Sequence, residues 1–325
     1  MSRSRRTATA LIAALAGLLL VLTGCSSQGG AQNAPGGSGG PDLTIAMITH
    51  EAPGSTFWDR VRNGANAAAD QLGVTLNYSN DPDSGKQATL IQNAIDSKAD
   101  GIAVTLANPD AVGPTLAKAA QAGIPTVAFN SGLDSYREYG ALMYFGSDES
   151  IAGQAVGTRL AEAGAGKALC VVHEQGNISL ETRCAGVKQN FPNTENIQVN
   201  GSDLPSVQQA LQAKLQEDPS ITDVVTLDAG IANAAVQAQA GAGTQAKIAT
   251  FDLSPDVVTA IQDGKIEFSV DQQPYLQGYL AVQALWLNLT NGNDIGGGRP
   301  VLTGPSFVDA SNIDAIATFA ENNTR

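Results

Sequence analysis

The stretch that decides the fold runs from Leu43 to Leu106 and alternates short apolar runs with longer amphipathic ones. It opens with LTIAMIT (43–49), continues with FWDRVRNGANAAADQL (57–72) and returns to VTLNY (74–78). A second amphipathic stretch (88–97) and the apolar run IAVTL (102–106) follow. Apolar runs of this length that alternate with helical patterns are typical of βαβ units, in which neighbouring strands are parallel.

Further along the chain, more short runs are almost wholly apolar, as parallel strands are when helices cover both faces of their sheet. We therefore expect an α/β fold built on doubly wound parallel sheets. These runs are residues 126–129, 168–172, 223–227 and 248–251.

Polar residues follow these strands directly, at the edge of a parallel sheet where ligands usually bind. Carboxylates and amides at successive strand ends, together with aromatic residues, are typical of a site for a polyhydroxylated ligand. The residues are His50-Glu51 with Phe57-Trp58, Asn108-Pro109-Asp110, Asn130-Ser131, Glu174-Gln175, Asp228, Asp252 and Gln272-Gln273.

The first 24 residues have the pattern of an export signal. Arg3, Arg5 and Arg6 precede an apolar run that ends in Leu22-Thr23-Gly24-Cys25, which resembles a bacterial lipoprotein signal. We expect cleavage after residue 24 and lipidation of Cys25, which anchors the protein to the outside of the cell membrane. An ordinary signal peptide or a true transmembrane helix is the alternative. Residues 25–41 are rich in Gly, Ser and Pro and predict a flexible tether.

Composition narrows the ligand and the partners. Residues 42–325 suffice for two lobes, each with its own core. The formal net charge of −13 becomes more negative once the arginine-bearing signal is removed, so nucleic acid is not expected as a partner and anionic ligands are disfavoured. The charge favours neutral or cationic small molecules, and no cofactor is expected.

With Cys25 assigned to lipid, Cys170 and Cys184 remain as a pair in an oxidising compartment. A disulfide between them is the simplest interpretation, and two buried free thiols are the alternative. The only histidines, His50 and His173, do not combine with these cysteines at a spacing usual for zinc, so no metal site is expected.

Several marks in order along the chain resemble the type I periplasmic solute-binding proteins, in particular the ribose- and galactose-binding group of ATP-driven sugar importers. The resemblance covers Leu43 to about Val308. The marks are Phe57-Trp58 before Asn63-Gly64-Ala65, AGIPTV (122–127), Gly146-Ser147-Asp148, Arg183 before a helix that ends near Phe191, and Phe251-Asp252 followed by Pro255.

The resemblance implies two similar lobes, residues 42–146 plus 273–303 and residues 147–272 plus 304–325, joined by three chain crossings near Ser147, Gln272 and Gly304. The lobes would close on a neutral monosaccharide or polyol by a hinge and deliver it to membrane permease and ATPase subunits. The protein would act as a monomer.

Carried over by position, Phe57 and Trp58 would stack on the sugar ring, while Arg183, Asp228, Asp252 and Gln272 would bind hydroxyls. Relatives that bind ribose-like pentoses have an Asp-Arg pair where this chain has Asn130-Ser131, and Asp228 stands where asparagine is common. A polyol or a furanose-type signalling molecule is therefore a ligand to consider besides ribose. Two structural alternatives stay open, namely a salt bridge between Asp252 and Arg183 and a core role for Trp58.

An enzyme is the rival class, because carboxylates such as Glu51 and Asp252 serve as acid and base in glycoside hydrolases. No Ser-His-Asp order or phosphate-binding loop is visible in the sequence, so we expect no enzyme activity. A sugar-responsive repressor would share the fold. The export signal argues against it.

Overall fold

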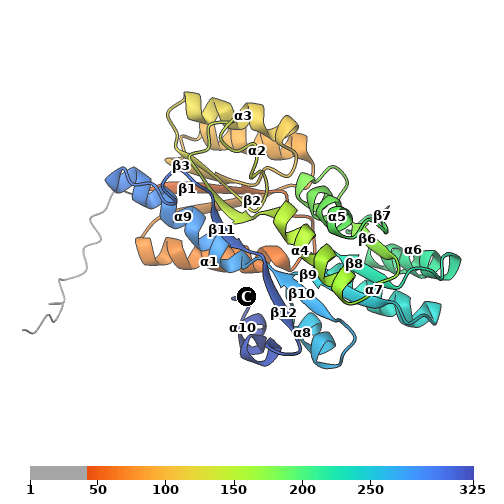
Figure 1. Cartoon of the computed structure of the whole chain (residues 1–325). Helices are drawn as coiled ribbons and strands as arrows, with labels where there is room; N and C mark the ends of the chain where they lie inside the picture. The colour runs from red at the N-terminus through yellow and green to blue at the C-terminus, as the bar shows by residue number, and fades with distance from the viewer. Residues whose placement is uncertain (1–41) are drawn as a thin grey trace, which may run out of the picture. The chain divides into compact units, whose positions relative to one another are not determined.

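The computed structural model describes residues 42–325, which form two six-stranded sheets covered by helices (Figure 1). The predicted α/β fold with two similar doubly wound lobes is therefore confirmed. The expected signal (1–24), tether (25–41) and lipid-bearing Cys25 lie outside the described residues.

The first sheet has the strand order β11-β5-β4-β3-β1-β2, and all five strand pairs are parallel. We call this sheet and the helices packed on it the first lobe. Its strands are β1 (Thr44–Thr49), β2 (Thr75–Asn80), β3 (Gly101–Val104), β4 (Thr126–Phe129), β5 (Met143–Ser147) and β11 (Val301–Gly304).

The second sheet repeats this order as β12-β10-β9-β8-β6-β7, except that its edge strand β12 pairs antiparallel with β10. This sheet and its helices form the second lobe. Its strands are β6 (Ala168–Val172), β7 (Thr194–Gln198), β8 (Asp223–Thr226), β9 (Lys247–Phe251), β10 (Phe268–Asp271) and β12 (Ser306–Asp309).

Helices cover both faces of each sheet, so each lobe has two apolar core layers. In the first lobe α1 (Phe57–Leu72) and α9 (Pro274–Asn291) cover one face, and α2 (Ser84–Asp96) and α3 (Pro109–Gln121) cover the other. The second lobe has α4 (Glu149–Glu162) and α5 (Ile178–Asn190) on one face and α6 (Leu204–Glu217), α7 (Ala229–Ala242) and α8 (Pro255–Gln262) on the other. The chain ends with the short 3-10 helix η1 (Ile313–Ala315) and α10 (Ala317–Glu321).

Helix α2 starts four residues earlier than the apolar pattern predicted. Asp83 caps it, because its side chain accepts a hydrogen bond from the backbone N–H of Lys86 at 2.9 Å. The cap fixes the start of the helix before the first apolar residue of the periodic pattern.

The chain passes between the two sheets three times. It leaves the first sheet after β5, returns between β10 and α9, and crosses again between β11 and β12. The residues at these passages are Ser147, Gln272 with Gln273, and Pro305.

Helices α1 and α9 in the first lobe, and α4 and α5 in the second, touch through glycines. A Cβ at Gly278 of α9 would lie 2.0 Å from the carbonyl oxygen of Val61 in α1, and one at Gly153 of α4 would lie 2.1 Å from that of Arg183 in α5. Only glycine permits such close backbone contact. In both lobes, therefore, glycines allow two helices to pack against each other on one face of the sheet.

The predicted disulfide between Cys170 and Cys184 is formed and links β6 to α5. In residues 42–325 no helix is both long and apolar enough to cross a membrane. The same residues contain no group of three or more His, Cys, Asp or Glu side chains that could hold a metal ion.

Candidate functional site

A cavity lies where the carboxyl ends of both sheets face each other, and sixteen residues line it. We call it the inner cavity. All eight residues predicted as ligand contacts lie on its wall, namely Phe57, Trp58, Asn130, Ser131, Arg183, Asp228, Asp252 and Gln272. The structure thus gathers residues that lie more than 200 positions apart in the chain.

Arg183 is the only lysine or arginine on the wall of the inner cavity in the described chain. Its guanidinium makes a two-pronged ion pair with Glu149, with Nε–Oε2 at 2.5 Å and Nη2–Oε1 at 3.0 Å, and lies over the ring of Phe251. Burial alone would lower the pKa of Arg183, but the charge and hydrogen bonds of Glu149 outweigh it and the pKa is raised. The arginine stays charged and has a fixed orientation.

The ion pair corrects one sequence-based alternative, because the partner of Arg183 is Glu149 and not Asp252. Sequence reasoning missed Glu149, although it follows the quoted mark Gly146-Ser147-Asp148 directly. The available signal was its position in the first turn of a helix that begins at a chain crossing.

Asp252 follows β9 with a left-handed φ of 66°, and Gln272 donates a hydrogen bond to its Oδ1 at 2.8 Å. Burial is the main cause that raises the pKa of Asp252 to about 7, and the neighbouring Asp228 raises it further, while Arg183 lowers it. Asp228 itself caps α7 through the backbone N–H of Gly230 at 2.7 Å. These two carboxylates face the cavity without a salt bridge in the part of the chain described.

Asn130 occupies the matching position in the first lobe, after β4, with a φ of 65°. Its Nδ2 donates to Oε1 of Gln272 at 3.3 Å, so the amide of Gln272 links Asn130 to Asp252. Next to it, Ser131 accepts a hydrogen bond from Ser179 of the second lobe at 2.9 Å. The strand ends of both lobes are therefore joined by hydrogen bonds on the wall of the cavity.

Phe57 and Trp58 begin α1 and pack edge to face, with ring centroids 5.0 Å apart. Trp58 is 3% exposed and also contacts the ring of His50, with centroids 4.9 Å apart. Both aromatic residues belong to the core of the first lobe and at the same time line the cavity. Trp58 is therefore both a core residue and a residue of the cavity wall.

Eight further residues line the inner cavity that were not among the predicted ligand contacts. Burial lowers the pKa of one of them, His50, and the charge of Glu174 offsets this only in part. The eight residues are His50, Ser55, His173, Glu174, Asn177, Ser179, Leu180 and Leu227.

Two carboxylates expected at the strand ends do not line the inner cavity. Glu51 accepts a hydrogen bond from Tyr78 at 2.7 Å and pairs with Arg62, so it serves the first lobe internally. Asp110 is exposed in the first turn of α3. A strand-end position places a residue near the edge of the sheet, but its neighbours decide where the side chain points.

Residues 45–294 match the family of the periplasmic binding protein domain. A carbohydrate transporter protein of Acidothermus cellulolyticus, solved in complex with myo-inositol, is 55% identical and superposes with a TM-score of 0.87, covering 88% of this chain and all of that one. A periplasmic sugar-binding protein of Legionella pneumophila is 26% identical with a TM-score of 0.75 and covers 81% of this chain and 99% of its own.

Two curated relatives add to this picture. The xylose/arabinose-binding protein of Sulfolobus acidocaldarius is 28% identical over 89% of this chain and 78% of its own length. The ribose import binding protein of Escherichia coli is 28% identical over 71% of this chain and 79% of its own length. The family acts outside the cytoplasm as the binding component of transporters, and this chain belongs to it, the periplasmic binding protein family, among relatives that bind sugars for ABC importers.

Proposed function

We propose that this protein captures a neutral cyclic polyol in the inner cavity, with myo-inositol as the first candidate, and delivers it to an ATP-driven importer. The observation that carries the proposal is an inner cavity lined by carboxylates, amides and aromatic rings, in a chain 55% identical to a protein solved with myo-inositol. A ring of hydroxyl groups offers both donors and acceptors to such a wall.

The roles of the wall residues follow from their chemistry. The carboxylates of Asp228 and Asp252 accept hydrogen bonds from hydroxyls, and the guanidinium of Arg183 donates to them. Phe57 and Trp58 cover the apolar C–H face of the ring. Each of these roles is a proposal, supported by the place of the side chain on the wall.

The ligand reaches this cavity by movement of the lobes. The cavity measures about 40 Å³ with the lobes in contact, so a six-membered ring can enter it only while the lobes are apart. We propose that residues 42–146 plus 273–303 and 147–272 plus 304–325 move as units about the three crossings and close on the ligand. The protein is then a monomeric, non-catalytic carrier that acylated Cys25 anchors to the membrane, and mass spectrometry of the mature N-terminus tests the anchor.

A thermal-shift screen followed by calorimetry tests the ligand class. We expect myo-inositol at one hundred times its Kd to stabilise the protein by about 2.7 kcal/mol, visible as a rise in Tm. The panel also contains the pentoses arabinose, xylose and ribose, because the curated relatives are named as binding them, and galactose as a hexose. Shifts with amino acids or sugar phosphates alone would refute the sugar-binding assignment.

A further inference from the structure

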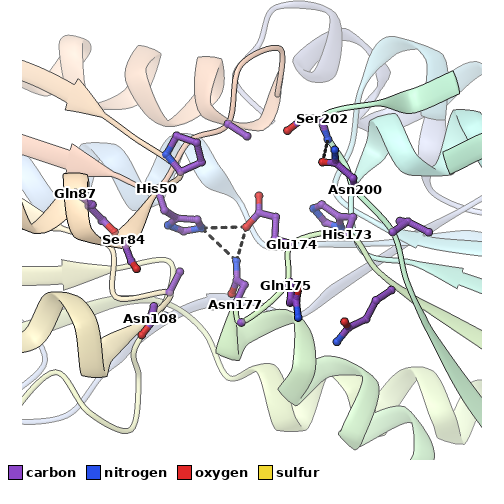
Figure 2. Close-up of a pocket in the computed structure, with 16 residues that line it drawn as sticks. His50, Ser84, Gln87, Asn108, His173, Glu174, Gln175, Asn177, Asn200 and Ser202 are labelled. Carbon is purple, nitrogen blue, oxygen red and sulfur yellow. Dashed lines mark hydrogen bonds and ion pairs between the residues drawn. The ribbon is translucent and has the colours of Figure 1, made fainter. Parts of the chain in front are cut away.

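A second, larger cavity lies directly outside the inner one, and the two share part of their walls. We call it the outer chamber. It measures about 560 Å³, and residues of both lobes line it, among them Gln87, Asn108, Gln175 and Asn200 (Figure 2). Four residues line both spaces, namely His50, His173, Glu174 and Asn177. The partition between the inner cavity and the outer chamber is thus made of side chains.

Three of the four shared residues meet across the lobes. Asn177 Nδ2 donates to Oε2 of Glu174 at 2.7 Å and lies 3.3 Å from Nε2 of His50, which is 3.8 Å from Glu174 Oε2. Figure 2 shows His50 reaching toward the other two from the first lobe. The contact joins residues 127 positions apart in the sequence and exists only while the lobes touch.

Each partner is held firmly from its own lobe. Nδ1 of His50 lies 2.7 Å from the hydroxyl of Thr105, and the imidazole packs against Trp58. Asn177 caps α5, because its Oδ1 accepts from the backbone N–H of Ser179 at 3.0 Å. The two side chains therefore meet in fixed orientations. Their contact closes the passage between the inner cavity and the outer chamber.

We propose that His50, Asn177 and Glu174 form a gate that retains the ligand in the inner cavity and limits it to single-ring polyols. The gate rests on the proposed function. A ligand that leaves the inner cavity toward the outer chamber must pass between Asn177 and His50, and a substituent that projects from the ring in this direction collides with them. The outer chamber, with its carboxamide lining, has room for a glycosyl group once the gate is removed.

The test compares myo-inositol with its galactosyl glycoside on wild type, Asn177→Gly and Glu174→Gln. Glycine is well tolerated at an N-cap, so Asn177→Gly should fold, and Glu174→Gln keeps the shape of the side chain while it weakens the gate. Gln175→Ala is the control, because Gln175 lines the outer chamber but not the inner cavity. Stopped-flow gives the dissociation rate, and calorimetry gives the affinity for the glycoside.

We expect Asn177→Gly to raise the dissociation rate of myo-inositol about tenfold, because changes at a closed contact appear mainly in that rate. We also expect Asn177→Gly to bind the galactosyl glycoside, which wild type and Gln175→Ala should not bind. Unchanged dissociation in both gate variants, or wild-type binding of the glycoside as tight as that of myo-inositol, overturns the gate alone. If wild type binds no cyclic polyol at all, the proposed function fails and the gate fails with it.

Discussion

The two lobes are built alike, yet they place different side chains at matching positions of their paired helices. Helices α1 and α9 pack through Gly64 and Gly278 just as α5 and α4 pack through Gly186 and Gly153. In this correspondence Arg183 and Glu149 of the second lobe match Val61 and Pro274 of the first. One lobe has a buried ion pair where the other has two apolar side chains.

The strand ends repeat the contrast. Asn130 and Asp252 share a left-handed backbone and the position after the matching strands β4 and β9, but only the second lobe has a carboxylate there. His50 and His173 also match, after β1 and β6. His50 lies beside the hydroxyl of Thr105, whereas the buried Nδ1 of His173 has no hydrogen-bond partner in the described chain.

The comparison shows that two lobes with the same fold can contribute different kinds of side chain to one site. With the roles proposed above, the second lobe would supply the charged groups Arg183, Asp228 and Asp252, and the first lobe would supply the neutral and aromatic groups Asn130, Phe57 and Trp58. Hydrogen bonds to charged groups contribute more free energy than neutral ones. Substitutions in the second lobe should therefore lower stability or ligand affinity more than those in the first lobe.

The largest effect is expected from Arg183→Met. Glu149 would stay buried without its partner, which should lower the free energy of unfolding by about 3–5 kcal/mol. Denaturant titration measures this loss. The double variant Arg183→Met with Glu149→Leu imitates the apolar pair of the first lobe and should regain most of the stability but no ligand binding. A single variant as stable as wild type contradicts the role assigned to the pair.

The disulfide comes next, because it ties α5 to β6 directly after Arg183. In the first lobe Met47 and Arg62 occupy the matching positions, so only the second lobe has this link. Cys170→Ala with Cys184→Ala should cost about 3 kcal/mol in a chain-entropy model for a loop of this length. Reductant should lower the denaturant midpoint of wild type and leave that of the variant unchanged, and an equal response of both is the contrary result.

How far sequence reasoning reached can be seen at Asp252 and Glu149. Asp252 follows an apolar strand, and strand order alone places such residues at the ligand edge. Glu149 and Asn177 begin helices, and their importance comes from partners that only the packing of α4 on α5, or of one lobe on the other, brings near. Periodicity along the chain carries no information on either packing.

A direct test of the lobe comparison sets Asp252→Ala against its counterpart Asn130→Ala. At pH 8, above the pKa of about 7 and therefore with Asp252 ionised, loss of a charged hydrogen bond of about 1.5–3 kcal/mol should weaken myo-inositol binding more than tenfold at Asp252. Loss of a neutral one, about 0.5–1.5 kcal/mol, should weaken it less at Asn130. Calorimetry on both variants decides the matter, and equal losses would show that the charge difference between the lobes does not govern binding.

The smallest expected effect is the change of stability with pH between pH 6 and pH 7, and it again separates the lobes. With the folded pKa of Asp252 raised to about 7 from a usual 3.8, the folded protein without ligand holds a proton there that the unfolded chain releases. The contribution of Asp252 to stability is therefore full below pH 3.8 and is lost as the pH rises through about 7, with a slope of at most about 1.4 kcal/mol per pH unit.

Asp252→Asn removes this dependence, so the variant should gain about 1 kcal/mol over wild type between pH 6 and pH 7 and keep the gain at pH 8. The lowered pKa of His50 acts in the opposite direction as the pH falls, but it is present in both proteins and cancels in their difference. Asn130→Asp, in the matching position, is the partner experiment, because it gives the first lobe a buried carboxylate and should create a new loss of stability toward alkaline pH. Parallel pH profiles of Tm for wild type and Asp252→Asn would mean that the second lobe holds its carboxylate ionised, and that it does so before any ligand arrives.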